Sequence, residues 1–222
     1  MFGERKYYLD LQVHTSRYSS CSTIPPEQII RVARGRGLDG VALTEHLQGW
    51  PPEELKALRA SSGDSSFVVL AGLEVATRSG DGNTGDLLVF GVRHLPPQPC
   101  SIDEVCRIAH QQGGIVIAPH PFAGLQGIGD EVYSSRIDGL EVYNFRYGGP
   151  EPSRRAERAW RQLGLAGIAS SDAHDLREIG RCCTEFDQPI AGEADFIEAI
   201  LAGRCRPRRK SPPIGLWRRL SG

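Results

Sequence analysis

The sequence GLDGVALTEH, residues 37–46, is a short apolar run that starts after a glycine and finishes on a histidine. Aliphatic and β-branched residues in such a run predict a strand over Leu38–Thr44. Because side chains alternate along a strand, His46 lies on the face of Thr44 and Glu45 lies on the opposite face. We therefore expect His46 to reach a site beyond the strand end and Glu45 to orient its surroundings.

Six further runs of this kind flank the first, and amphipathic stretches lie between most of them. The predicted strands are Tyr7–Val13, Leu38–Thr44, Phe67–Thr77, Asp86–Val92, Gly114–Ala118, Gly139–Tyr143 and Ala166–Ser170. The predicted helices are Pro26–Arg36, Pro52–Ala60, Ile102–Gln112, Ser153–Leu163 and Ala194–Ala202. Strands that alternate with helices predict an α/β chain with a largely parallel sheet. Seven strands in 222 residues indicate one barrel-like domain that ends near Gly203.

One connection departs from the parallel pattern. Only Arg78–Gly85 separates the third and fourth predicted strands, and this segment is rich in Gly, Asp and Asn. A parallel crossover needs a dozen or more residues, so these two strands are expected to form an antiparallel hairpin. The hairpin would place Asp86 beside Glu74–Thr77.

The charge is balanced overall but unevenly distributed. The chain has 26 Lys and Arg against 27 Asp and Glu, a net charge of −1, which excludes a strongly basic nucleic-acid binder and an acidic disordered chain. Seven basic residues and no acid lie close to the C-terminus: Arg204, Arg206, Arg208, Arg209, Lys210, Arg218 and Arg219. Subtracting these seven leaves 19 basic against 27 acidic groups, or −8. We expect an acidic barrel over 1–203 and a basic tail over 204–222, either a solvated or docked arm or one that attracts nucleic acid.

The remaining composition indicates a cytoplasmic protein. No apolar run approaches the length of a membrane span, and the first residues are polar, unlike a signal peptide. The six cysteines show no Cys-x-x-Cys spacing, which favours reduced thiols. We therefore expect no contact with a membrane.

Metal-binding side chains gather at the predicted strand ends. Four of the six histidines lie there: His14, His46, His120 and His174. Asp10, Gln12, Glu45, Glu74 and Asp172 accompany them. Barrel proteins assemble their sites where parallel strands end, and histidine with carboxylate is the ligand set of divalent transition metals. Alternation along the strands lets Gln12 point with His14, and Asp172 with His174.

These segments resemble the PHP family, named for polymerase and histidinol phosphatase. The segments that carry the resemblance are Leu9–Thr15 (LDLQVHT), Gly37–His46 (GLDGVALTEH), Ala71–Glu74 (AGLE), Ala118–Pro121 (APHP), Asp138–Asn144 (DGLEVYN) and Ser170–His174 (SSDAH). They occur in the family's order and span residues 9 to 180.

The resemblance implies a distorted seven-stranded, TIM-like (β/α) barrel that hydrolyses phosphate esters with two or three metals at the strand ends. It implies a first metal on His14, Glu74 and Asp172. Glu74 would bridge to a second metal on His120 and Asp86. His46 and His174 would lie at a third position.

The chain departs from the family pattern at several positions. Gln12 stands where the family usually has the first histidine of His-x-His, Glu45 replaces an aspartate, and Asp86 often has a histidine counterpart. The Asp found shortly after the first motif is absent from Ser19–Ser22. Asp86 shifts metal preference from zinc toward manganese or magnesium, while an amide at 12 is a weak, neutral ligand. The expected ligand set is Gln12, His14, His46, Glu74, Asp86, His120, Asp172 and His174. We expect two divalent ions drawn from Mn, Zn, Fe or Mg.

The expected function is metal-dependent hydrolysis of a phosphomonoester, a nucleotide or a nucleic-acid end. Glu74 would bridge the metals, and His46 or His174 would stabilise the leaving group or donate its proton. No lysine lies at a strand end, so arginine has to bind the phosphate. The candidates, each shortly after a strand-end motif, are Arg17, Arg146 and Arg181.

Two alternatives stay open at this point. An amidohydrolase-type barrel also places metals at strand ends, although many of these enzymes need a bridging lysine and an intact His-x-His. A metal-poor, catalytically silent module that binds a ligand or partner is the other alternative, and Gln12 and Asp86 motivate it.

Overall fold

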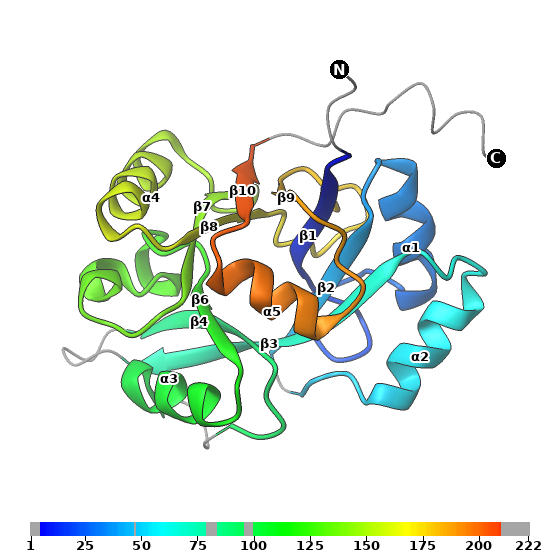
Figure 1. The fold of residues 1–222 in the computed structure, drawn as a ribbon, viewed down its shortest axis with the longest axis horizontal. Helices are drawn as coiled ribbons and strands as arrows, with labels where there is room; N and C mark the ends of the chain where they lie inside the picture. Colours follow the sequence, from blue (N-terminus) through cyan, green and yellow to red (C-terminus); the bar gives the residue numbers. More distant parts are fainter. Residues whose placement is uncertain (1–4, 47, 79–83, 96–99, 210–222) are drawn as a thin grey trace.

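A computed structural model of the chain describes residues 5–46, 48–78, 84–95 and 100–209 (Figure 1). The strands are β1 (Tyr7–Val13), β2 (Gly40–Glu45), β3 (Val68–Arg78), β4 (Thr84–Phe90), β5 (Cys100–Ser101), β6 (Ile115–Ala118), β7 (Gly139–Asn144), β8 (Ala166–Ser170), β9 (Cys183–Phe186) and β10 (Cys205–Arg208). The helices are α1 (Pro26–Gly35), α2 (Pro52–Ser61), α3 (Ile102–Gln111), α4 (Pro150–Leu163) and α5 (Glu193–Leu201), with 3₁₀ turns η1 (Gly124–Gln126) and η2 (Gly129–Tyr133). None of the described helices is long and apolar enough to span a membrane.

The strands form one sheet that curls into a nearly closed barrel. Their order is β10-β9-β1-β2-β3-β4-β6-β7-β8, and β5 pairs with β3. The two edges of the sheet approach each other, since Cys205 Sγ of β10 donates to the Gly167 carbonyl oxygen of β8 at 3.6 Å. The predicted α/β barrel is therefore confirmed, with more strands than the seven expected.

The hairpin prediction is confirmed in detail. β3 and β4 pair antiparallel, and Ala76 is directly opposite Asp86. The β1–β2, β2–β3, β6–β7 and β7–β8 pairs are parallel. Asp86 consequently lies at the same end of the barrel as Glu74, which is two residues from Ala76 along β3.

The C-terminal boundary differs from the prediction. Cys205–Arg208 forms β10, which pairs antiparallel with β9, so the sheet continues past Gly203 and the first part of the expected tail is wrong. The basic pattern concealed a strand in which Cys205 is buried and the arginines reach outward. Residues 210–222 of the expected tail lie outside the described residues.

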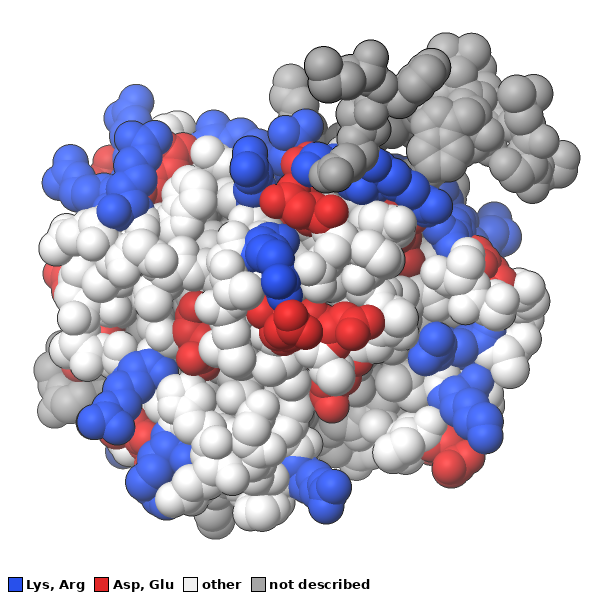
Figure 2. All heavy atoms as spheres, in the orientation of Figure 1, with Lys and Arg blue, Asp and Glu red and all other residues white. Residues whose placement is uncertain are grey.

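Acidic residues of the barrel pair with the basic residues around β10. Arg204 contacts Glu198, Arg208 Nε lies 3.4 Å from Glu185 Oε2, and Arg209 Nη2 lies 3.7 Å from Glu157 Oε1. Figure 2 shows basic side chains beside acidic ones over the visible face. The −8 of the rest of the chain and the positive charge of this segment therefore partly compensate locally.

Helix α5 closes one end of the barrel. Phe196 packs edge-on against Phe90 with ring centroids 4.9 Å apart, within a cluster of buried residues that includes Leu9 and Ile115 from the starts of β1 and β6. A second cluster packs α1 and α2 against the outer face of β1 to β3. With the strand starts covered by apolar side chains, the opposite end, where the parallel strands finish, is left for polar groups.

An irregularity in β1 redirects its side chains. The register between β1 and β2 shifts between Asp10 and Val13. Leu11 packs in the cluster with α5, whereas Val13 packs in the cluster with α1 and α2, so the strict alternation predicted for β1 is wrong at this point. Bulges of this kind re-aim side chains next to functional sites.

Candidate metal centre

Histidine and carboxylate side chains converge at the end of the barrel opposite α5. Three groups have ligand atoms within 4.8 Å of one another: His14, His46 and His174; His14, Glu74 and Asp172; and Glu74, Asp86 and His120. They include seven of the eight side chains predicted as ligands, from β3, β4 and the segments directly after β1, β2, β6 and β8. Parallel strand ends therefore meet here as expected.

Glu74 of β3 lies at the centre of these groups. Its Oε2 is 3.1 Å from His14 Nε2 and 3.5 Å from His46 Nδ1. Its Oε1 is 3.1 Å from His120 Nε2. One carboxylate thus faces two ligand groups with its two oxygens, which is the geometry of a bridging ligand.

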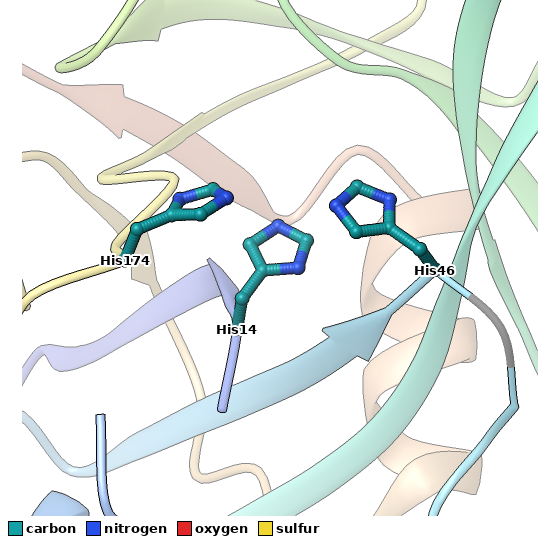
Figure 3. A group of neighbouring side chains, drawn as sticks. All are labelled: His14, His46 and His174. Carbon is teal, nitrogen blue, oxygen red and sulfur yellow. The ribbon is translucent and has the colours of Figure 1, made fainter. Parts of the chain in front are cut away.

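His14 is flanked by the two other histidines of the first group (Figure 3). Its ring centroid lies 4.6 Å from that of His46 and 4.4 Å from that of His174. Its Nε2 is also 3.3 Å from Asp172 Oδ1, and His174 Nδ1 is 3.6 Å from the same oxygen. The rings and the carboxylates therefore enclose one polar region.

Two buried nitrogen atoms suggest what this region is built to bind. His14 Nε2 and His120 Nδ1 are buried and have no hydrogen-bond partner among the described residues. His14 Nε2 lies near two carboxylate oxygens without meeting hydrogen-bond geometry, and a buried unpaired polar atom is costly. A divalent cation would satisfy it, since the surrounding donors are imidazole nitrogens and carboxylate oxygens. The residues present fit such an ion.

Without a metal ion, protons on the buried histidines supply part of the positive charge that the surrounding carboxylates require. Burial lowers the pKa of His14 and of His120, but carboxylate contacts outweigh it and raise the values to about 10 and about 9. Burial raises the pKa of Glu74, yet His120 and His14 hold it well below its usual range. Burial and the nearby Glu74 charge raise the pKa of Asp86 to about 7. Metal binding here must displace protons.

Two candidate ligands have an unusual backbone. Among the described non-glycine residues, positive φ occurs at His120 (29°) and at Asp172 (54°). Such conformations cost on the order of 1–3 kcal/mol and persist only where the surroundings enforce them. The backbone conformation at these two positions of the centre therefore lowers the free energy of unfolding.

A second set of carboxylates holds the main chain beside the ligands. Asp10 accepts from Ser171 N at 2.8 Å, Glu45 from Thr15 N at 3.1 Å, Glu141 from His120 N at 2.6 Å, and Glu178 from His174 N at 2.8 Å. Each bonded amide belongs to a ligand residue or to its immediate neighbour. Carboxylates that accept main-chain N–H groups in this way fix the geometry of the ligand residues, and three of the four, Asp10, Glu45 and Glu141, are buried.

Glu45 behaves as predicted. Asp10 was named beside the histidines without a role, whereas Glu141 and Glu178 were missed as site residues. Glu45 also accepts from Ser19 Oγ at 2.5 Å and Trp50 Nε1 at 2.9 Å, so it orients the loop after β1 while His46 faces Glu74. A charged residue inside the apolar strand Gly139–Asn144 was the available signal for Glu141. Glu178 lies in a loop without any pattern.

Gln12 holds Glu74 through its amide. Gln12 Nε2 donates to Glu74 Oε1 at 2.8 Å, and Gln12 Oε1 lies 3.4 Å from Ser170 Oγ. An amide nitrogen has no lone pair to offer a metal. The side chain points into the centre with His14 as predicted, but its role as a ligand would require the amide to turn.

The three predicted phosphate-binding arginines lie in different surroundings. Arg17 Nε donates to Glu54 of α2 at 2.6 Å. Arg181 stacks over the Phe145 ring at 5.6 Å. Arg146 Nη1 donates to Glu178 Oε2 at 3.4 Å, and its charge contributes to lowering the pKa of His174, after burial and the charge of His14.

The fold and this strand-end cluster define an α/β-barrel protein with a histidine–carboxylate centre. Residues 150–205 match a family profile described as PHP-associated. The uncharacterised protein MJ1587 of Methanocaldococcus jannaschii is 30% identical over 146 residues, covering 61% of this chain and 80% of that protein. The chain belongs to the PHP family.

Solved structures share the barrel. A two-domain protein of Bacteroides vulgatus, containing a predicted PHP-like metal-dependent phosphoesterase, superimposes with a TM-score of 0.69 at 18% identity, covering 95% of this chain and 66% of that one. Endonuclease Q of Pyrococcus furiosus, a lesion-specific enzyme, gives 0.63 at 15% identity, covering 91% of this chain and 58% of that one. A further endonuclease Q structure contains a duplex with an abasic lesion at its active site. The chain therefore spans little more than half of endonuclease Q.

Proposed function

We propose that this protein is a metal-dependent phosphoesterase whose centre is organised by Glu74. The observation that carries the proposal is that the two Glu74 oxygens face separate ligand groups, with Oε2 3.1 Å from His14 Nε2 and Oε1 3.1 Å from His120 Nε2. The shared family and the phosphoesterases among proteins of this fold support it.

The ligand groups favour two divalent ions. His14, Glu74 and Asp172 would hold one ion, and Glu74, Asp86 and His120 the other. His14 Nδ1 lies 3.5 Å from Ser19 Oγ, so His14 offers only Nε2 to the centre and joins one ion. His46 and His174 then flank the pair. The oxygen-rich set suits Mn²⁺, Fe²⁺, Zn²⁺ or Mg²⁺.

The bound ions would supply charge neutralisation on the phosphate and activation of a water molecule. Burial lowers the pKa of His46 and of His174, so both imidazoles are neutral at pH 7 and can accept a proton. His174 Nδ1 lies 2.9 Å from the Asp172 carbonyl oxygen, to which it can only donate, so its Nε2 carries the free lone pair. We propose that His46, which has 39% of its side chain exposed, would take a proton from the attacking water and then donate it to the leaving group.

For the substrate we propose a nucleotide or a nucleic-acid end. Arg146 is the best-placed of the three arginines for a phosphate, because its charge acts on His174. The Arg146 charge beside His174 favours an anionic substrate. Proteins of this fold include endonuclease Q, which has been seen with a duplex that carries an abasic lesion at the active site. We propose a cytoplasmic location, because the described residues, which include all six cysteines, contain no disulfide bond.

The test measures metal content and hydrolysis together. Purified protein should retain divalent metal, and added Mn²⁺ should stimulate hydrolysis of an aryl phosphate or a bis-aryl phosphate. The control is Asp39→Asn, a buried carboxylate at the other end of the barrel that accepts from Tyr8 N at 3.0 Å. Near-zero metal and no Mn²⁺-stimulated turnover in the wild type would favour the silent binding module instead.

A further inference from the structure

The backbone of His120 is held in place by the side chain of Glu141. Glu141 lies on β7, is 1% exposed, and its Oε2 accepts the main-chain N–H of His120 at 2.6 Å. His120 follows β6, which pairs in parallel with β7. The contact thus joins the ends of two neighbouring strands at a residue whose φ of 29° is not a relaxed one.

The Glu141 carboxylate is itself fixed from two other directions. Asn144 Nδ2 donates to Oε2 at 2.9 Å, and Ser170 Oγ of β8 donates to Oε1. Asn144 Oδ1 in turn accepts from Tyr147 N at 2.7 Å, and the Tyr147 ring packs against His120 with centroids 4.8 Å apart. Both carboxylate oxygens of Glu141 therefore accept hydrogen bonds from the protein, and Glu141 belongs to none of the three ligand groups.

We propose that Glu141 is a positioning residue that sets the imidazole of His120 for metal binding. The proposal rests on the proposed function, because it assumes that His120 and Glu74 hold a divalent ion. Without the Oε2 acceptor, the buried His120 N–H would lose its partner and the positive φ would lose its main restraint. The chain would relax, and His120 Nε2 would move from its place 3.1 Å from Glu74 Oε1.

Two substitutions separate the hydrogen bond from the negative charge. In Glu141→Gln the amide oxygen can still accept from His120 N and Asn144 Nδ2. The new NH₂ group would face Ser170 Oγ, and the Ser170 proton could then turn toward Gln12 Oε1, which lies 3.4 Å from Ser170 Oγ in the wild type. In Glu141→Met the side chain keeps its length but has no comparable acceptor. If positioning acts through the hydrogen bond, Gln preserves it and Met abolishes it.

The experiment measures Mn²⁺ binding to the metal-stripped full chain by calorimetry, which needs no substrate. Glu141→Met should weaken the affinity of the ion at His120 by about 10–100-fold, while Glu141→Gln should stay within about threefold of the wild type. Asp39→Asn is the matched control, and it should lower thermal stability without changing Mn²⁺ affinity. Should the Met variant fail to fold, Ser170→Ala removes one restraint on Glu141 and should weaken binding by about threefold.

A double-mutant cycle distinguishes positioning from a general loss of structure. In a His120→Ala background, Glu141→Met should cause no further loss of Mn²⁺ affinity, because the two residues act as one unit. Additive losses, unchanged affinity in Glu141→Met, or a Gln variant as weak as Met would each overturn the proposal. A wild type that binds no Mn²⁺ overturns the proposed function as well, whereas hydrolysis with normal Mn²⁺ binding in Glu141→Met overturns only the role of Glu141.

Discussion

His14 Nε2 and Glu74 Oε2 lie 3.1 Å apart at the end of the barrel, yet they do not form a hydrogen bond. Both side chains are buried, one directly after β1 and the other on β3, and β2 lies between these strands. A pair of this kind is stable when a cation or a proton lies between its members. We expect a divalent cation to take that place.

Replacing Glu74 should remove one ion and most of the activity. In Glu74→Gln only one oxygen remains, so the ligand groups on either side no longer share a carboxylate. We expect the number of Mn²⁺ ions bound to fall from two to at most one. We expect kcat/KM to fall by more than about 100-fold, which exceeds the usual effect of changing a residue that only hydrogen-bonds to a metal ligand. Calorimetry and steady-state kinetics measure the two effects; full occupancy in the variant would contradict the bridging role.

Gln12→His should strengthen metal binding. An imidazole at position 12 replaces the amide that now donates to Glu74 Oε1 at 2.8 Å, and it brings a nitrogen lone pair to the centre. We expect Mn²⁺ affinity to rise by about tenfold. Gln12→Leu serves as the control without a ligand atom. Unchanged occupancy in the histidine variant would mean that position 12 does not reach a metal.

The metal-free protein should lose stability as the pH rises. The folded pKa of His14 is raised from 6.5 to about 10, so the stabilisation from its protonated form is complete below about 6.5 and is lost as the pH approaches 10. We expect the Tm of the metal-free protein to drop by at least about 5 °C between pH 7 and pH 10. The Mn²⁺-loaded protein should drop less, and His14→Gln should remove most of the difference. Equal pH profiles in all three samples would be inconsistent with this account.

Chelation should expose how strongly the ions support the fold. A ligand present at about 100 times its Kd stabilises the folded state by about 2.7 kcal/mol. Removing divalent metal with a chelator should therefore lower Tm by about 5–10 °C, and added Mn²⁺ should restore it. Asp39→Asn, at the other end of the barrel, should show the same shift on chelation. A Tm that is insensitive to both treatments would indicate that nothing binds there.

Arg146 should matter more for substrate than Arg17. Arg146 lies beside Glu178, which holds His174, whereas Arg17 is tied to Glu54 of α2 at 2.6 Å. We expect Arg146→Ala to raise KM by about tenfold, in line with the loss of a charge-assisted hydrogen bond to phosphate. Arg17→Ala should change it by less than about twofold. The reverse order would place the substrate over the loop after β1 instead.

The features that could be predicted from the sequence depend on the spacing of residues close together in the chain. Alternation placed His46 and Glu45 on different faces, and the short Arg78–Gly85 connection placed Asp86 near Glu74; both are confirmed. Such features depend on local spacing, which the sequence contains.

Features that depend on contacts between distant segments could not be predicted in this way. β9 and β10 have only four residues each and mix charge with cysteine, so no apolar run marks them. Glu178 acts through the backbone of His174, and the positive φ of Asp172 is imposed by its surroundings. The role of Gln12 depends on which end of its amide faces Glu74, and only the packed site determines that.

The most direct measurement is a crystal structure of the Mn²⁺-soaked protein with anomalous scattering at the manganese edge. We predict two ions, one contacting His14 and Asp172, the other contacting His120 and Asp86, with one Glu74 oxygen on each. Two peaks that both lie away from Glu74, or no anomalous peak among these residues at saturating Mn²⁺, would contradict it.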